Sequence, residues 1–170
     1  MLERSSLLIL LFGTSGSGKT FLGDLFSKTF GLYHYELDLD LTPAMRNAIA
    51  DDREFTEVMR DEYFSHLIPR ITELQSKHSR CILTQAVYKE RHRQFLKTHI
   101  PDLELVWITA PQDLIVARLQ ERDGGISGEY ALKIQHNFEP PVRGKKLLND
   151  TADSKLLIDR FSSLFFDTSK

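Results

Sequence analysis

The chain has 170 residues, of which 41% are hydrophobic and 27% charged, and its formal net charge is −2. This composition is typical of a globular domain and excludes a disordered chain. The net charge excludes the strong basic field that duplex nucleic acid would require. The longest apolar run, Leu7–Phe12, is far shorter than the roughly 20 residues of a membrane helix. The single cysteine, Cys81, cannot form an internal disulfide. Together these features predict a cytoplasmic protein that does not bind membranes.

Hydrophobic patterning predicts strands that alternate with helices, without a linker or repeat that would divide the chain. The expected strands are Leu7–Phe12, 33–37, 81–86, Leu103–Thr109 and Lys145–Leu148. The expected helices are 19–29, 55–75, 90–98, 111–122, 129–138 and 153–165, and Pro69 is expected to kink or divide the second of them. Such alternation is typical of an α/β fold. We therefore expect one domain, residues 1–170, built on a mainly parallel five-stranded sheet.

A glycine-rich segment between the first strand and the first helix matches the pattern G-x-x-x-x-G-K-[S/T] at every fixed position. Its residues are Gly13, Thr14, Ser15, Gly16, Ser17, Gly18, Lys19 and Thr20. Glycines let the backbone curl so that its N–H groups face inward, and the helix N-terminus adds partial positive charge. Lys19 would reach the β- and γ-phosphates of ATP, and the Thr20 hydroxyl would ligate Mg²⁺. The segment therefore predicts a three-layer P-loop NTPase fold that binds ATP and Mg²⁺.

Acidic residues follow the second strand, in the segment Glu36-Leu37-Asp38-Leu39-Asp40. Because alternate residues of an extended chain point the same way, we expect Asp38 and Asp40 to share the side that faces the ligand crevice. One carboxylate could hold a metal-bound water while the other accepts a proton from an acceptor hydroxyl. The alternative, two solvated acids in a loop, remains open. The third strand ends without an acid, which argues against a motor or switch ATPase.

From Leu8 to about Pro141, the chain resembles the small P-loop metabolite kinases, the group that contains gluconate kinase and shikimate kinase. The segment Asp38-Leu39-Asp40-Leu41-Thr42-Pro43 is similar to the gluconate kinase D-G-D-x-L-H-P with one residue missing. The segments at 84–93 and 138–141 are similar to that family's C-S-A-L-K-x-x-Y-R and L-E-x-P. Leu39 replaces the family's glycine, and Gly124-Gly125-Ile126 replaces its G-H-F.

This resemblance implies an ATP-dependent phosphotransferase that acts on a hydroxyl of a small, anionic metabolite, with a gluconate-like sugar acid favoured. It implies that Asp40 acts on the acceptor hydroxyl and that Asp38 lies on the metal side, both of them contacting substrate. It also implies a small helical lid at about residues 122–141. The departures at Leu39 and Ile126 fall on positions that bind the acceptor or shape the lid.

Several basic residues are candidates for binding phosphate or an anionic acceptor. Arg118 and Arg122 lie one helical turn apart, before a glycine-rich hinge. We expect Arg122 to neutralise the transferring phosphoryl group, and the resemblance implies that Arg118 flanks the adenine or the phosphates. Arg46, Arg60 and Lys89 are candidates for holding the acceptor's carboxylate or phosphate. For each of these residues, a solvated surface position is the alternative.

Two other functions remain open at this stage. The basic segment at 84–93 vaguely resembles that of polynucleotide 5′-hydroxyl kinases, so a polynucleotide or nucleoside 5′-hydroxyl kinase is one alternative. A non-catalytic ATP-binding regulatory module is the other. The negative net charge argues mildly against a long nucleic-acid substrate, so the expected partner is a small-molecule acceptor. The protein is expected to be a monomer or a homodimer.

Overall fold

The computed structural model describes residues 6–121 and 128–166, and at its centre is one five-stranded sheet. The strand order is β2-β3-β1-β4-β5, and all four pairings are parallel. The α/β fold with a five-stranded sheet is therefore confirmed. The strands are β1 (Leu7–Phe12), β2 (Tyr33–Glu36), β3 (Arg80–Gln85), β4 (Leu103–Thr109) and β5 (Lys145–Leu148).

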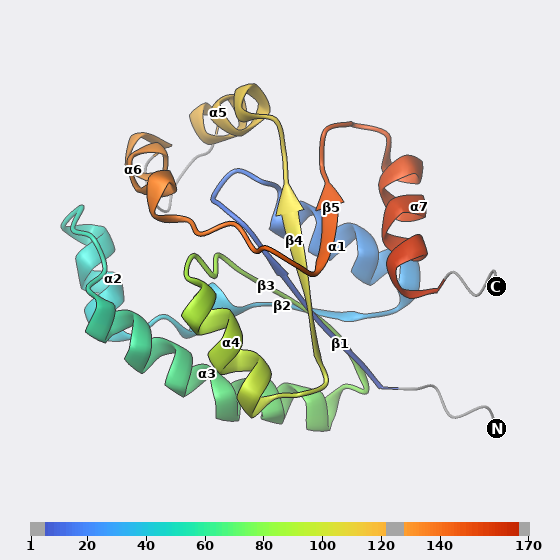
Figure 1. Ribbon diagram of the computed structural model, residues 1–170, viewed down its shortest axis with the longest axis horizontal. Helices are drawn as coiled ribbons and strands as arrows, with labels where there is room; N and C mark the ends of the chain where they lie inside the picture. Colours follow the sequence, from blue (N-terminus) through green and yellow to red (C-terminus); the bar gives the residue numbers. More distant parts are fainter. Residues whose placement is uncertain (1–5, 122–127, 167–170) are drawn as a thin grey trace.

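Helices cover both faces of the sheet and make three layers (Figure 1). Successive side chains of β1 point to opposite faces, so Leu8 and Leu10 enter one buried cluster while Ile9 and Leu11 enter the other. The first cluster includes side chains of α3 (Glu57–Lys77) and α4 (Glu90–His99), and the second includes side chains of α1 (Lys19–Phe30) and α7 (Ser154–Phe165). A central strand that is buried on both faces explains the unbroken apolar run of β1.

Two further helices lie beyond the carboxyl ends of the strands (Figure 1). They are α5 (Gln112–Gln120) and α6 (Gly128–Ile134), and α6 continues into the short 3₁₀ helix η2 (Gln135–Asn137). The helix expected at 129–138 is thus divided in two, and the one expected to reach residue 122 ends at Gln120. The predicted lid at 122–141 includes residues 122–127, which lie outside the described residues.

The segment between β2 and α3 differs from the prediction. It contains a 3₁₀ helix, η1 (Leu37–Asp40), and an unpredicted helix, α2 (Pro43–Ala50). Thr42 caps α2 by accepting a hydrogen bond from the Met45 N–H, and Pro43 occupies its first turn. This Thr-Pro pair is a helix-start signal that could have been recognised in the sequence.

Helix α3 begins later than expected, and it is not divided. Thr56 caps it by accepting from the Met59 N–H, so the first helical residue is Glu57. Pro69 lies inside the helix, yet the helix is continuous from Glu57 to Lys77. The expected division at Pro69 is therefore wrong, although proline removes one backbone donor there.

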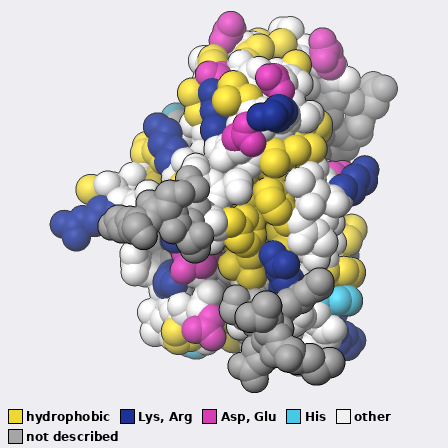
Figure 2. Space-filling model, turned by 90° about the vertical axis from the view of Figure 1, so that its right-hand side faces the viewer, with side chains coloured by type: hydrophobic (Ala, Val, Ile, Leu, Met, Phe, Trp, Pro, Cys, Tyr) yellow, Lys and Arg dark blue, Asp and Glu magenta, His cyan; other side chains and the backbone are white. Residues whose placement is uncertain are grey.

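In the part of the chain that the structure describes, no helix is long and apolar enough to cross a membrane. Figure 2 shows the side of the molecule that is turned to the right in Figure 1. On that side, Lys, Arg, Asp and Glu side chains are scattered around a strip of hydrophobic ones. Among the coloured side chains visible in Figure 2, charges of both signs are mixed and do not form a continuous basic surface.

Candidate active site at the carboxyl ends of the strands

The P-loop connects β1 to α1 and curls around the N-terminus of that helix. Gly16 and Gly18 have φ values of 81° and 91°, in the left-handed region where side chains are strained. The Lys19 ammonium donates to the carbonyls of Gly13 and Thr14, at 3.0 and 2.8 Å, so it lies folded back over the loop. The predicted segment therefore forms a turn with the shape of a phosphate cradle.

Two residues from distant segments pack against this loop. Arg118 of α5 donates to the carbonyls of Gly16 and Ser17, both at 3.4 Å. Asn149, which follows β5 and is buried, donates to the Ser17 carbonyl at 2.9 Å and accepts from Arg118 at 3.2 Å. A Cβ atom at Gly18 would lie 2.1 Å from the Asn149 amide nitrogen, so only glycine fits there. The structure thus brings Arg118 to the P-loop, as the sequence predicts, and adds Asn149.

A threonine and a glutamate form a pair of oxygen donors beside the loop. The Thr20 hydroxyl donates to the Glu36 carboxylate at 3.1 Å. These hard oxygens suit Mg²⁺, which usually takes one or two protein ligands and completes its octahedron with water and phosphate oxygens. The described residues contain no cluster of three or more His, Cys, Asp or Glu side chains that could hold a metal ion alone. The donor set therefore fits a Mg²⁺ that is bound together with a nucleotide.

Glu36 is a candidate Mg²⁺ ligand that was not singled out from the sequence. It is the last residue of β2, and the carboxyl ends of parallel strands are where ligands bind. That position is the signal that could have identified it.

The expectation that Asp38 and Asp40 share one side assumed an extended chain, and this assumption is wrong. Both residues lie in the 3₁₀ helix η1 and not in an extended strand, so alternation does not place them on one side. Asp38 lines the cavity described below, together with Ser15 of the P-loop. Asp40 lies 3.3 Å from the Nε of Arg70, which also donates to Tyr35. The structure therefore places Asp38, and not Asp40, among the described residues that line this cavity.

A cavity of about 210 Å³ lies beside the P-loop. One wall comes from α6, which belongs to the predicted lid, through Tyr130 and Ile134. Arg60 reaches this cavity, as its predicted role requires, and its side chain is only 14% exposed. The described lining residues are Ser15, Asp38, Leu41, Met45, Ile49, Phe55, Arg60, Tyr63, Phe64, Gln85, Ala86, Tyr88, Tyr130 and Ile134.

Two residues predicted to bind the acceptor lie elsewhere. Arg46 is exposed on α2 and donates to the Leu41 carbonyl. Lys89 forms an ion pair with Glu139 at 3.1 Å, and the same carboxylate accepts from the Glu90 N–H at 2.8 Å. Neither Arg46 nor Lys89 is among the residues that line the cavity. Lys89 instead ties the start of α4 to the segment that follows η2. The predicted catalytic residue Arg122 lies outside the described residues, so its role stays a prediction.

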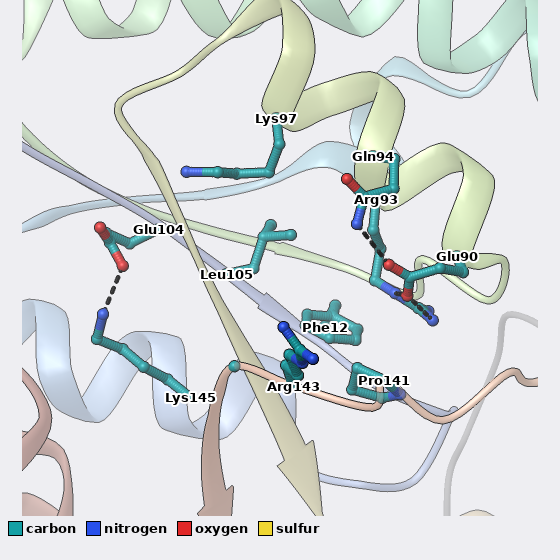
Figure 3. A pocket seen from close by; sticks show the side chains of 11 residues that line it. Phe12, Glu90, Arg93, Gln94, Lys97, Glu104, Leu105, Pro141, Arg143 and Lys145 are labelled. Carbon is teal, nitrogen blue, oxygen red and sulfur yellow. Dashed lines mark hydrogen bonds and ion pairs between the residues drawn. The ribbon is translucent and has the colours of Figure 1, made fainter.

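A second pocket, of about 300 Å³, lies between α4, β4 and the segment that enters β5 (Figure 3). Its described lining includes four basic side chains and two acidic ones, which are Arg93, Lys97, Arg143, Lys145, Glu90 and Glu104. Lys145 contacts Glu104 at 2.6 Å, and Arg93 contacts Glu90 at 2.7 Å. Lys97 donates to two main-chain carbonyls. None of the described residues that line this pocket belongs to the P-loop, so it is less suited to a phosphate acceptor than the cavity beside that loop.

The parallel sheet, the P-loop after its central strand and the separate cavity beside that loop define a protein of the P-loop kinase class. Residues 9–131 match the family model described as an AAA domain, so the chain belongs to that family. Among curated proteins, it is 25% identical over 127 residues to the thermosensitive gluconokinase of Escherichia coli strain K12. That match covers 74% of this chain and 67% of the relative.

Solved structures of kinases share the fold. A sugar kinase from Janibacter sp. HTCC2649 superposes with a TM-score of 0.78 at 20% identity, over 93% of each chain. A gluconokinase from Sinorhizobium meliloti 1021 superposes with a TM-score of 0.75 at 19% identity, over 95% of each chain. Shikimate kinase from Acinetobacter baumannii gives a TM-score of 0.60 at 16% identity, over 98% of this chain and 97% of the other.

Proposed function

We propose that the protein is an ATP-dependent phosphotransferase that acts on a hydroxyl of a small, anionic acceptor of the sugar-acid class. The observation that carries this proposal is that one cavity includes Ser15 of the P-loop, the carboxylate of Asp38 and the guanidinium of Arg60. A hydroxyl bound next to the P-loop would have a proton acceptor beside it, and its anionic end would have a cationic partner.

The residues divide the work of phosphoryl transfer among them. Lys19 exchanges its two loop carbonyls for phosphate oxygens when ATP binds. Thr20 and Glu36 would hold Mg²⁺, which would supply positive charge against the phosphate oxygens. Asp38 accepts the proton of the acceptor hydroxyl. The oxygen of that hydroxyl bonds to the γ-phosphorus, while the bond between this phosphorus and the β–γ bridging oxygen breaks and ADP leaves. Arg60 orients the acceptor, and Arg122 remains the candidate for neutralising the transferred group.

The relatives support the choice of acceptor class. The curated match is a gluconokinase, and two of the similar structures are a sugar kinase and a gluconokinase. A polynucleotide 5′-hydroxyl kinase is less favoured, because the basic residues that suggested it form ion pairs with acidic side chains of the protein. Lys89 pairs with Glu139, Arg91 contacts Asp61, and Arg93 is buried against Glu90. A non-catalytic module would have no use for Asp38 and Arg60 in a cavity beside the P-loop.

An acceptor panel tests the proposal. The protein is incubated with Mg²⁺ and ATP labelled on its γ-phosphate, and with sugar acids, nucleosides or 5′-hydroxyl oligonucleotides. We expect a labelled product with a sugar acid and none with the oligonucleotides. A labelled oligonucleotide would support the polynucleotide alternative. ATP binding without any labelled product would support the regulatory module.

Three further features belong to this proposal. The lid at about residues 122–141 closes over the cavity, and the position of α6 in one wall of the cavity supports this. The protein works in the cytoplasm, as a monomer or a homodimer. Partial proteolysis with and without ATP and acceptor tests the lid, and equal cleavage under both conditions would contradict closure.

A further inference from the structure

We propose that His34 is a positioning residue, which fixes helix α1 against β2 and so holds Thr20 and Glu36 at the spacing that Mg²⁺ requires. This inference rests on the proposed function, because it concerns the Mg²⁺ that would be bound together with the nucleotide. It follows from a group of three side chains that lies next to the two oxygen donors. The group consists of Asp24, His34 and Thr84, and it is called the histidine network below.

The imidazole of His34 joins three elements of the fold. Its Nδ1 lies 2.8 Å from a carboxylate oxygen of Asp24 on α1, and its Nε2 lies 3.3 Å from the hydroxyl oxygen of Thr84 on β3. A carboxylate can only accept a hydrogen bond, so Nδ1 donates to Asp24. In the neutral ring, Nε2 then accepts from the Thr84 hydroxyl. Strand β2 is therefore tied to a helix and to its neighbouring strand by directional contacts.

The histidine network lies in an apolar part of the molecule. The His34 side chain is only 9% exposed, and Thr84 is 3% exposed. Ile82, the register partner of His34, belongs to the apolar cluster that the sheet forms with α1 and α7. An apolar side chain could fill such a place without desolvating polar groups. Hydrogen bonds specify one geometry and apolar contacts do not, so the network is better explained by positioning than by stability.

Helix α1 lies directly against the ring of His34. A Cβ atom at Gly23 would lie 2.4 Å from the Nε2 of His34 and 2.7 Å from its Cε1. Gly23 is buried inside the helix, where glycine is less favourable than alanine. Its missing side chain leaves the space that the imidazole occupies. The position of the helix therefore depends on the ring.

The histidine network and the candidate Mg²⁺ ligands connect the same two elements. Asp24 follows Thr20 by about one turn of α1, so these two side chains lie on the same face of the helix. Glu36 is the next residue but one after His34 on β2, so both side chains point to the same face of the sheet. Glu36 is also the register partner of Thr84. A shift of α1 that breaks the network therefore also changes the 3.1 Å contact between Thr20 and Glu36.

Strand β2 benefits from an additional connection because it lies at the edge of the sheet. It has four residues, and within the described sheet it pairs with β3 alone. Mg²⁺ demands a nearly ideal octahedral geometry, so a small displacement of one ligand weakens its binding. The phosphates themselves are bound by the backbone of the P-loop, which does not include β2. Loss of the network should therefore affect Mg²⁺ more than the nucleotide.

The variant His34→Phe removes both hydrogen bonds and keeps an aromatic ring. Binding of a non-hydrolysable ATP analogue is measured by calorimetry in excess Mg²⁺ and in EDTA, without an acceptor. The ratio of the Kd in EDTA to the Kd in Mg²⁺ measures how much the metal contributes. We expect His34→Phe to lower this ratio by about fivefold or more, and to leave the Kd in EDTA within about twofold. The exposed His66 on α3 supplies the matched control, His66→Phe, which should leave both values unchanged.

A double-mutant cycle with Glu36→Gln tests whether His34 acts through Glu36. Once Glu36 is replaced, His34→Phe should change the Kd ratio by less than about twofold, because the interaction that it supports is already lost. A histidine that only stabilises the fold would lower the ratio equally in both backgrounds, or would weaken both Kd values in parallel. Either result would overturn the inference, and so would a Kd ratio near one in the unmodified protein.

The variant Asp24→Ala decides the question if His34→Phe does not fold. Asp24 is 58% exposed, so its truncation leaves the core intact, and the melting temperature checks this. We expect the Kd ratio to fall by about threefold or more, because the ring loses the hydrogen bond that orients it. An unchanged ratio in Asp24→Ala would overturn the inference.

These measurements need no acceptor, so they are independent of phosphoryl transfer. If the Kd ratios change as expected but the acceptor panel gives no labelled product, the inference stands and the proposed function fails. If a labelled product forms but the variants keep the Kd ratio of the unmodified protein, the proposed function stands and the inference fails. Absence of nucleotide binding would overturn both.

Discussion

The hydroxyl of Thr20 donates to the carboxylate of Glu36 across 3.1 Å, and this contact joins the first turn of α1 to the last residue of β2. The two side chains come from segments that the P-loop separates, and they meet where a P-loop protein holds its metal ion. Sequence spacing alone did not distinguish Glu36 from the two acids that follow it.

Glu36→Gln is expected to raise the Mg²⁺ concentration that gives half-maximal rate by about tenfold or more, because the charge that helps to hold the cation is lost. Titration of the initial rate with Mg²⁺ at saturating ATP and acceptor measures this. Glu62→Gln, on the exposed side of α3, is the matched control and should leave the Mg²⁺ dependence unchanged. The role of Glu36 fails if both variants behave alike.

Asp38→Asn is expected to lower kcat by about 10²-fold while ATP binding is retained, because the proton acceptor at the cavity is lost. Asp40→Asn should retain turnover within about twofold, since Asp40 contacts Arg70 in a partly exposed ion pair, a kind of interaction worth about 1 kcal/mol or less. Steady-state kinetics of the two variants measure the difference. A large loss in Asp40→Asn with normal turnover in Asp38→Asn would restore the roles that the sequence suggested.

Lys19→Ala is expected to reduce kcat by roughly 10²- to 10³-fold, which is typical for the loss of one group that stabilises charge in the transition state. Lys28→Ala lies near the end of the same helix and is exposed, so it controls for a general loss of positive charge. Near-normal turnover of Lys19→Ala would remove the P-loop lysine from the mechanism.

Arg60→Ala is expected to raise the KM of the acceptor by roughly 10- to 100-fold, with the KM of ATP unchanged, because one charged hydrogen bond to the acceptor is lost. Arg46→Ala is the matched control, since Arg46 is exposed and donates to the Leu41 carbonyl outside the cavity. Parallel increases in both KM values would instead indicate that Arg60 maintains the structure of the site.

The stability of the protein is expected to fall below about pH 6.5, partly through His92. Burial lowers the pKa of His92, although its 2.8 Å contact with Asp61 acts in the opposite direction. In the unfolded chain, the pKa of a histidine is near 6.5. Between this pH and the lower pKa of the folded state, His92 is therefore protonated more often in the unfolded chain than in the folded protein. Stability is therefore retained above about pH 6.5 and lost as the pH falls toward the folded pKa.

Urea unfolding between pH 7.5 and pH 5 measures this dependence. His92→Phe should flatten it, because a group that protonates more readily in the unfolded state is removed. His66→Phe, an exposed position on α3, should keep the dependence of the unmodified protein. Identical slopes for His92→Phe and the unmodified protein would exclude His92 as a cause.

The sequence could predict the features that depend on consecutive residues. β1, β4 and β5 have the bounds that the pattern predicts, because apolar runs ended by turn residues leave little freedom in their assignment. The P-loop could be predicted for the same reason, since eight adjacent residues supply both its shape and its chemistry.

Arg60 was identified as a candidate on the basis of charge and position. Arg46 was a candidate for the same reasons, and only the structure shows that the two residues lie in different surroundings. Arg60 reaches the cavity from α3, whereas Arg46 lies exposed on a helix that the sequence analysis did not predict.

By itself, the sequence determined the α/β class, the P-loop and the presence of acids at the end of β2. Only the tertiary structure decided which acid lies where, because the direction of a side chain depends on backbone contacts made across the fold. The Tyr63 hydroxyl binds the Leu37 carbonyl where the chain tightens into η1, and Arg70 contacts Asp40 from α3. These partners lie 26 and 30 residues along the chain, so no local pattern records them.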